Sequence, residues 1–225
     1  MEIVARIHTD FATKFGVPRQ SGLAPSLTAR IVFEPAWRTP DCIKGLEDFS
    51  HIWLLWQFSQ SPDKYAATVR PPRLGGNTRM GVFATRSPFR PNRIALSSVK
   101  LERIEYDTPE GPVLIVSGAD LMNGTPIVDI KPYLAFTDSH PDAVGGFADA
   151  HVDDRLAVDF PPDLLARIPA DLQNGLLEVL AGDPRPAYQE DPARVYGFVF
   201  AGFEIQFTVD AARLTVVRVE KEGTR

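Results

Sequence analysis

The chain has 225 residues, of which 44% are hydrophobic and 24% charged, and its formal net charge at pH 7 is −5. This length is enough for a large core in one or two domains, and 20 prolines favour turns and short strands over long helices. Cys42 is the single cysteine, which excludes an intramolecular disulfide framework and a cysteine-based metal site.

The sequence predicts no membrane segment. Residues 1–11 lack a basic stretch followed by an apolar one, so we expect no secretory signal. The longest apolar run, Ile52 to Phe58, is too short to cross a bilayer. We therefore expect a cytoplasmic protein.

Up to about residue 135, short β-branched and partly alternating runs predict strands, and Pro- and Gly-containing turns separate them. The segment "TPDCIKGLEDFS" has room for one short helix. Short strands at this spacing, with no long helix between them, favour a closed or nearly closed β-barrel. The runs are "EIVARIH", "LTARIVF", "IWLLWQF", "MGVFAT", "IALSSVKL" and "PVLIVSGAD".

The composition changes after Phe136. Residues 139–160 are acidic and aperiodic, which predicts a linker, and residues 161–225 predict a small α+β domain. Its leucines recur at helical spacing from Leu164 to Leu180, Gly182 ends the pattern, and Pro169 is expected to divide it. The last segment, "VYGFVFAGFEIQFTVDAARLTVVRVE", predicts a three-stranded meander.

Several common sites are missing from the sequence. It has no Gly-x-Gly-x-x-Gly, no Gly-Lys-Ser/Thr phosphate loop, no His-Glu-x-x-His and no Gly-x-Ser-x-Gly. A metalloenzyme or a serine hydrolase is therefore not favoured, and we expect no metal.

The stretch from Arg70 to Leu101 contains no acidic residue, although the chain as a whole is acidic. Eight basic residues lie between Lys64 and Lys100, and six of them are arginines. A solvated basic face is one explanation. Because the arginine fork suits phosphate and loops commonly carry binding groups, an anionic partner such as RNA is favoured.

Two polar segments are candidates for chemistry. "FGVPRQSG" places Arg19 and Gln20 in a Pro/Gly turn, which by spacing alone is simply a loop. "DLMNGTPIVDIKPY" is first a hairpin signal, because Asn-Gly lies between apolar runs. Its two aspartates and its lysine could also form a polar cluster that handles a proton or ribose hydroxyls.

Taken together and in this order, four segments resemble the TrmO family, also called TsaA-like or YaeB-like proteins. They are "VPRQSG", "GLEDFSHIWLLWQF", "RPPRLGGNTRMGVFATRSPFRPNRIALS" and "DLMNGTPIVDIKPY", and the resemblance covers residues 3–136. "GDPRPAY", residues 182–188, resembles a motif of the C-terminal domain of the bacterial members.

The resemblance implies a mainly β fold, with a single-sheet β-barrel (TsaA-like) methyltransferase domain at residues 1–138 followed by the α+β domain, and it implies a homodimer. It also implies a reaction. The family transfers a methyl group from S-adenosylmethionine to N6 of threonylcarbamoyladenosine, the base 3′ of the tRNA anticodon, usually in threonine tRNAs.

The resemblance also implies a cofactor pocket. An arginine can hold the carboxylate of S-adenosylmethionine, Asp120 can accept from its ribose hydroxyls, and apolar residues can hold its adenine. Ser59 stands where many relatives have histidine, and Asn123 where many have aspartate. The implied pocket residues are Pro18, Arg19, Gln20, Ser59, Gln60, Arg86, Leu96, Asp120, Leu121, Met122 and Asn123.

For catalysis we expect Asp129 as the general base, with Lys131 and Tyr133 as orienting groups, although Asp129 could equally serve only to tie the hairpin together. Arg70, Arg73 and Arg90 are expected to contact the anticodon stem-loop or the threonyl carboxylate of the substrate. Two other functions remain open: methylation of another nucleobase or a small metabolite, and RNA binding without catalysis.

Overall fold

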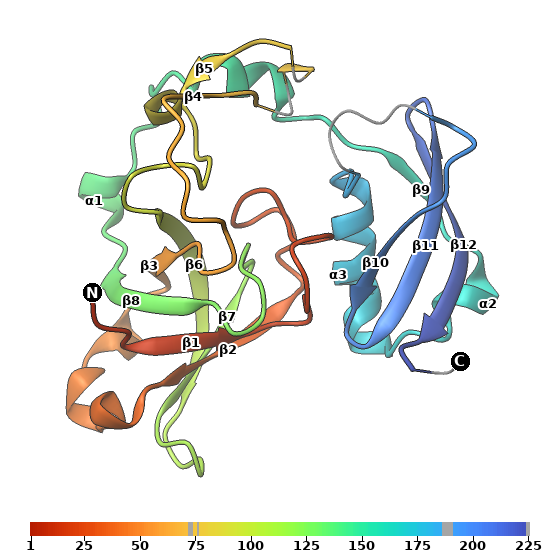
Figure 1. The fold of residues 1–225 in the computed structure, drawn as a ribbon. Coiled ribbons are helices and arrows are strands. Elements are labelled where there is room, and N and C mark those ends of the chain that lie inside the picture. Colours follow the sequence, from red (N-terminus) through yellow and green to blue (C-terminus); the bar gives the residue numbers. More distant parts are fainter. Residues whose placement is uncertain (72–73, 76, 186–190, 224–225) are drawn as a thin grey trace.

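The computed structural model describes residues 1–71, 74–75, 77–185 and 191–223. The chain forms a β-barrel and, beside it, a four-stranded sheet with helices, as Figure 1 shows. This confirms the predicted fold class. Within the described ranges, no helix is long and apolar enough to cross a membrane.

Six antiparallel strands close the barrel in the order β1-β2-β7-β6-β3-β8. Strand β3 shows why the sequence folds this way, because Ile52, Leu54 and Trp56 point into the core and alternate with more exposed residues. Pairing of Ala5 with Ile127 closes the ring. The strands are β1 (Ala5–His8), β2 (Thr28–Phe33), β3 (His51–Gln57), β6 (Ile94–Glu105), β7 (Val113–Ser117) and β8 (Pro126–Pro132).

The connection from β2 to β3 contains three 3₁₀ helices: η1 (Pro35–Trp37), η2 (Pro40–Cys42) and η3 (Leu46–Asp48). The segment "TPDCIKGLEDFS", expected to have room for one short helix, contains two of these, η2 and η3. Gly45 lies between η2 and η3 at φ +86°, a left-handed conformation that interrupts a helix.

The connection from β3 to β6, residues 58–93, is called the arch here. It contains the two-stranded pair β4 (Thr68–Val69) and β5 (Met80–Gly81), and then η5 (Val82–Ala84). The expected strand "MGVFAT" is thus a strand for two residues only. The chain turns there because the backbone N–H and the hydroxyl of Thr85 both donate to the Val82 carbonyl.

Beyond α1 (Ala135–Asp138) and η6 (Gly146–His151), the C-terminal sheet has the order β10-β11-β12-β9. The predicted meander is confirmed: β10 (Tyr196–Phe200), β11 (Phe203–Asp210) and β12 (Arg213–Lys221) pair antiparallel in sequence. Strand β9 (Ala157–Asp159) lies within the segment expected to be a linker, and it pairs parallel with β12.

Pro169 divides the predicted helical segment into α2 (Pro162–Leu165) and α3 (Ala170–Ala181), as expected. Helix α3 lies on the side of the C-terminal sheet that faces the barrel (Figure 1). Its buried residues Leu176, Val179 and Leu180 belong to the second hydrophobic core. This helix therefore brings the C-terminal domain next to the loop between β1 and β2.

Candidate functional site

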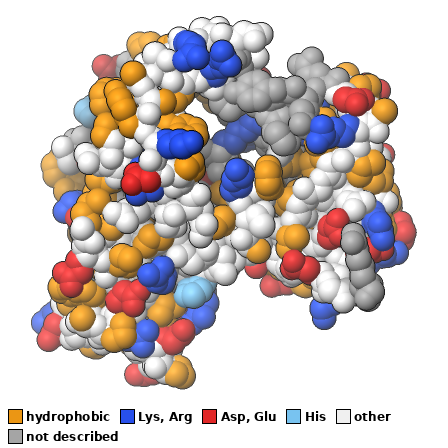
Figure 2. All heavy atoms as spheres, viewed as in Figure 1, with side chains coloured by type: hydrophobic (Ala, Val, Ile, Leu, Met, Phe, Trp, Pro, Cys, Tyr) orange, Lys and Arg blue, Asp and Glu red, His pale blue; other side chains and the backbone are white. Residues whose placement is uncertain are grey.

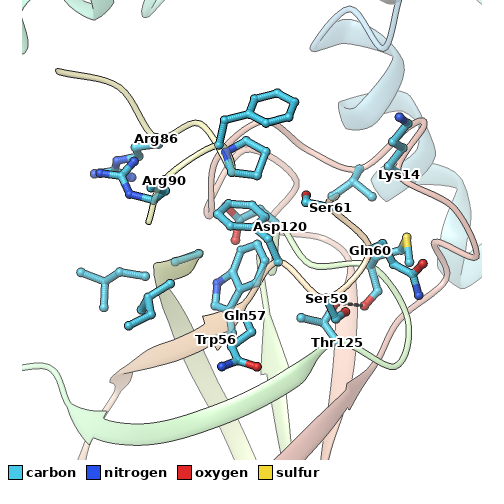
Figure 3. A pocket seen from close by; sticks show the side chains of 18 of the residues that line it. Lys14, Trp56, Gln57, Ser59, Gln60, Ser61, Arg86, Arg90, Asp120 and Thr125 are labelled. Carbon is cyan, nitrogen blue, oxygen red and sulfur yellow. Dashed lines mark hydrogen bonds between the residues drawn. The ribbon is translucent and has the colours of Figure 1, made fainter. Parts of the chain in front are cut away.

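A cavity of about 730 Å³ lies at one end of the barrel. Its walls come from segments far apart in sequence: residues 14–20 before β2, the end of β3, the arch, the start of β6, and residues 120–125 before β8. Figure 2 shows the molecule hollowed between its two halves, with Lys and Arg side chains around the hollow. Figure 3 shows the cavity from close by.

Asp120 is the acidic group in the cavity wall, and a chain of hydrogen bonds holds it. The Ser97 hydroxyl donates to Asp120 Oδ1 at 2.6 Å, and Trp56 Nε1 donates to Ser97 Oγ at 2.9 Å. Burial raises the pKa of Asp120 above its usual value, while the Ser97 hydrogen bond and the charge of Arg86 act in the opposite direction. The carboxylate is thus fixed and partly desolvated.

Among the described residues, three arginines line the cavity, and two of them, Arg19 and Arg86, are held by partners on another segment. Arg86 comes from the arch, and its Nη1 donates to Gln20 Oε1 on the opposite segment. Arg19 comes from the loop before β2, and its Nη2 donates to the Asp183 carbonyl at 2.8 Å. Both guanidiniums are therefore oriented by partners on another segment, which limits their motion.

The remaining wall is largely apolar. Trp56 and Phe58 pack edge to face with ring centroids 4.6 Å apart, and Ile94 lies beside them in the wall. Leu96 is 48% exposed and Phe89 37% exposed, although both line the cavity. Partly exposed apolar groups at a cavity provide a surface on which a flat ring can be buried.

Nine of the eleven expected cofactor residues line this one cavity: Pro18, Arg19, Gln20, Ser59, Gln60, Arg86, Leu96, Asp120 and Met122. The other two have different positions. Leu121 is fully buried in the barrel core. Asn123 is exposed, and its side-chain oxygen accepts a hydrogen bond from the Thr9 backbone N–H at 3.2 Å.

The three expected catalytic residues lie outside the described wall of the cavity. Lys131 Nζ lies 2.9 Å from Asp129 Oδ2, and the Tyr133 ring packs against Trp53 with centroids 5.4 Å apart. Asp129 is opposite Leu55 in the β3–β8 pairing, and Leu55 does line the cavity. Asp129 is therefore next to a cavity residue across the strand pairing, whereas Tyr133 lies toward the other end of that pairing, where its N–H donates to the His51 carbonyl.

The three arginines expected to bind RNA differ from one another. Arg90 lines the cavity, and its Nη1 donates to the carbonyls of Thr85 and Ser87 at 2.8 and 3.3 Å. Arg70 is exposed on the arch beside β4. Arg73 lies outside the described residues.

Sequence reasoning missed other residues that shape the site. Ser97 gave no signal because a serine in a β-strand is usually unremarkable, yet it is 2% exposed and bonds Asp120. Lys14 precedes the recognised turn and still lines the cavity. Phe89 lies inside "RSPFRPN", where an aromatic among arginines and prolines could have drawn attention.

In the described part of the chain, no His, Cys, Asp and Glu side chains are grouped to hold a metal ion.

The chain is similar to proteins of one family over nearly its whole length. The tRNA-methyltransferase O N-terminal domain matches residues 6–139, and the TrmO C-terminal domain matches residues 153–222. A tRNA (adenine(37)-N6)-methyltransferase from Escherichia coli is 40% identical over 228 residues, 97% of each chain. One from Eikenella corrodens is 47% identical over 173 residues, 72% of this chain and 92% of that protein.

Further relatives have names that refer to S-adenosylmethionine dependence or binding. The crystal structure of TrmO from Pseudomonas aeruginosa superposes with a TM-score of 0.78 at 32% identity, and the match covers 98% of this chain and 97% of that chain. Together, the two domain matches and these relatives show that the chain belongs to the tRNA-methyltransferase O family.

Proposed function

We propose that this chain is an S-adenosylmethionine-dependent methyltransferase that methylates N6 of the adenine 3′ of the tRNA anticodon. We propose further that this adenine carries the threonylcarbamoyl group and that the substrates are threonine tRNAs. The observation that carries the proposal is the cavity itself. It combines a fixed carboxylate, the oriented guanidiniums of Arg19 and Arg86 and an apolar wall in a chain of this family.

The polar and apolar side chains of the cavity fit S-adenosylmethionine. Asp120 can accept from ribose hydroxyls, Arg19 or Arg86 can pair with the amino-acid carboxylate, and Leu96 can cover the adenine. The cavity volume lies in the range of small-molecule sites. When bound, this cofactor supplies a methyl group on a sulfonium, which is already a good electrophile.

The task left to the protein is to align and activate the nucleophile. N6 of the modified base belongs to a urea, and its lone pair is delocalised, so loss of its proton would assist attack. We propose Asp129 as the base, oriented by Lys131 at 2.9 Å and by the backbone N–H of Ile130. Asp120 is the competing candidate, because it lines the cavity itself.

We propose that the anticodon stem-loop approaches over the arch. The described arch contributes Arg70, Arg79, Arg86 and Arg90, and no carboxylate lies between Arg70 and Leu101 in the sequence. A local basic surface is needed because the whole chain is acidic. We also propose a cytoplasmic homodimer, because the family resemblance implies a dimer and the sequence predicts neither a secretory signal nor a membrane segment. Sedimentation should give about twice the chain mass of 24.9 kDa.

The test is methyl transfer to threonine tRNA that carries threonylcarbamoyladenosine, followed by mass spectrometry of the nucleosides. We expect a methylated nucleoside that depends on both S-adenosylmethionine and the threonylcarbamoyl group. Methylation of unmodified adenosine or of a free metabolite would favour another substrate, and tRNA binding without transfer would indicate a non-catalytic module. In Asp129→Asn, both binding steps should persist while turnover falls by about 10²–10⁴-fold.

A further inference from the structure

The loop between β1 and β2, residues 9–27, carries three of the proposed cofactor residues, and it packs into the other domain. All of these residues are described, and they contain neither strand nor helix. Phe11 and Leu27 are buried in the hydrophobic core of the C-terminal domain, and the Phe11 and Phe200 rings lie 5.6 Å apart. A loop of this length takes its shape from what it packs against.

Hydrogen bonds fasten this loop to the C-terminal domain near both of its ends. The Ala201 N–H donates to the Asp10 carbonyl at 2.9 Å. The hydroxyl of Ser26 donates to Glu178 Oε1 at 2.7 Å, and its backbone N–H donates to Glu178 Oε2 at 3.0 Å. Glu178 belongs to α3, so the helix holds the loop directly before β2.

Two glycines allow this contact to be close. A Cβ at Gly16 would lie 2.3 Å from the Phe198 ring, and Gly16 also has φ +84°. A Cβ at Gly175, on α3, would lie 2.1 Å from a Leu27 methyl group. Contacts this short cannot be made by any larger residue without movement, so loop and domain fit each other closely.

The contact nearest the cofactor cavity joins Arg19 to the end of α3. Arg19 Nη2 donates to the Asp183 carbonyl at 2.8 Å, just after Gly182 caps the helix. Asp183 has φ +56°, and its carboxylate holds Arg185 Nε and Nη2 at 2.8 and 2.9 Å. The C-terminal end of a helix carries partial negative charge, which favours a guanidinium there.

A second cavity of about 280 Å³ lies between the loop and α3, and Lys14, Val17, Pro18 and Arg19 line both cavities. The loop is therefore a thin wall between the cofactor cavity and the C-terminal domain. Next to Arg19, Gln20 accepts from Arg86 of the arch. A continuous set of contacts thus runs from α3 through the loop to the opposite wall of the cofactor cavity.

From these contacts we propose that the C-terminal domain shapes the cofactor cavity, and that Asp183 is a positioning residue which holds Arg19 through its backbone carbonyl. The proposal rests on the proposed function, because it assumes that Arg19 contacts the methyl donor. It assigns the domain a role in donor affinity. Displacing the Asp183 carbonyl should raise the KM for S-adenosylmethionine and leave kcat at saturating donor unchanged.

The experiment compares Asp183→Val with two matched variants. A β-branched residue is disfavoured at positive φ, so Asp183→Val should displace the carbonyl, whereas Asp183→Gly keeps the backbone conformation. Ala211→Val is the control, because Ala211 has φ +48° in the exposed turn between β11 and β12. This control introduces the same backbone strain in the C-terminal domain, but at a different turn.

The probe is S-adenosylhomocysteine, measured by calorimetry, with hydrogen exchange of residues 9–27 as a readout independent of activity. In Asp183→Val we expect the Kd to rise about fivefold to thirtyfold, equivalent to 1–2 kcal/mol, and exchange in the loop to accelerate. Asp183→Gly and Ala211→Val should both resemble the wild type. If Asp183→Val does not fold, Ser26→Ala takes its place, because Ser26 is exposed. This variant should also raise the Kd for S-adenosylhomocysteine.

Arg19→Ala separates this inference from the proposed function. If Arg19→Ala weakens binding while Asp183→Val and Ser26→Ala bind normally, the positioning role is wrong and the cofactor site stands. If Asp183→Val and Ala211→Val lose the same affinity for S-adenosylhomocysteine, the cause is general destabilisation, and the positioning role is also wrong. If the wild type does not bind S-adenosylhomocysteine, both proposals fall.

Discussion

Replacing Asp120 with asparagine should weaken cofactor binding strongly. The substitution preserves shape and keeps an oxygen that can accept from Ser97, so the 2.6 Å contact can persist. What is lost is a charged acceptor for the ribose hydroxyls. A hydrogen bond to a charged group contributes about 1.5–3 kcal/mol, so the Kd for S-adenosylmethionine should rise about 10- to 150-fold at pH 7.

The same substitution should stabilise the protein without cofactor at neutral pH. Burial raises the pKa of Asp120 in the fold above its value in the unfolded chain. Protonated Asp120 is therefore favoured by folding, and its contribution to stability is complete below the unfolded pKa and is lost as pH rises through the folded pKa. Asparagine does not ionise, so Asp120→Asn should gain stability over the wild type at pH 7, and the difference should vanish near pH 3.

Urea unfolding at both pH values and calorimetry with S-adenosylmethionine check the two effects together. Asp107→Asn, in the exposed turn between β6 and β7, is the matched control and should change neither quantity. If Asp120→Asn binds S-adenosylmethionine at pH 7 with wild-type affinity, this carboxylate does not contact the cofactor. A loss of stability at pH 7 would contradict the idea that burial makes its ionisation costly.

Three other predictions follow from the same structure. Ser97→Ala should lower the free energy of unfolding by about 1–3 kcal/mol, because it leaves the buried Trp56 N–H without its acceptor; urea unfolding measures this. Arg70→Glu should weaken binding of an anticodon stem-loop and flatten its dependence on salt by about one unit of slope, with unchanged cofactor affinity in calorimetry. Burial and then the nearby charge of Asp171 raise the pKa of Asp10, so Asp10→Asn should raise the urea midpoint at pH 7 and have little effect near pH 3.

The barrel could be predicted from the sequence because its signal is local. In β3 the buried Ile52 and Leu54 alternate with Trp53 and Leu55, and this period of two is visible without knowing any partner strand. Pro169 likewise interrupts the helical pattern for a local reason, because a proline in a helix interior lacks the N–H that the helix needs. Such features depend on neighbours in the sequence, and a single sequence is enough to find them.

The site could be predicted only in part, because cavity membership depends on distant segments. The β3–β8 pairing shifts register between Leu55 and Trp56, and sequence patterns do not show such a bulge. Whether Asp129 faces the cavity or the neighbouring surface therefore could not be predicted. The pairing of Arg19 with Asp183, 164 residues away, is equally invisible in either segment alone.

The arginines of the acid-free stretch from Arg70 to Leu101 have a structural role besides the proposed RNA binding. Arg90 donates to the Thr85 and Ser87 carbonyls, and Arg93 donates to the Ser61 carbonyl at 3.1 Å, so arginines hold the arch together through its backbone. Arg93 also lies 3.6 Å from a carboxylate oxygen of Asp63, so one guanidinium holds a carboxylate and a carbonyl of the arch at the same time. A guanidinium has five N–H donors, more than one or two carbonyls require, so the same arginine can hold the arch and still meet a phosphate. The same arginines can therefore hold the fold of the arch and make the proposed contact with RNA.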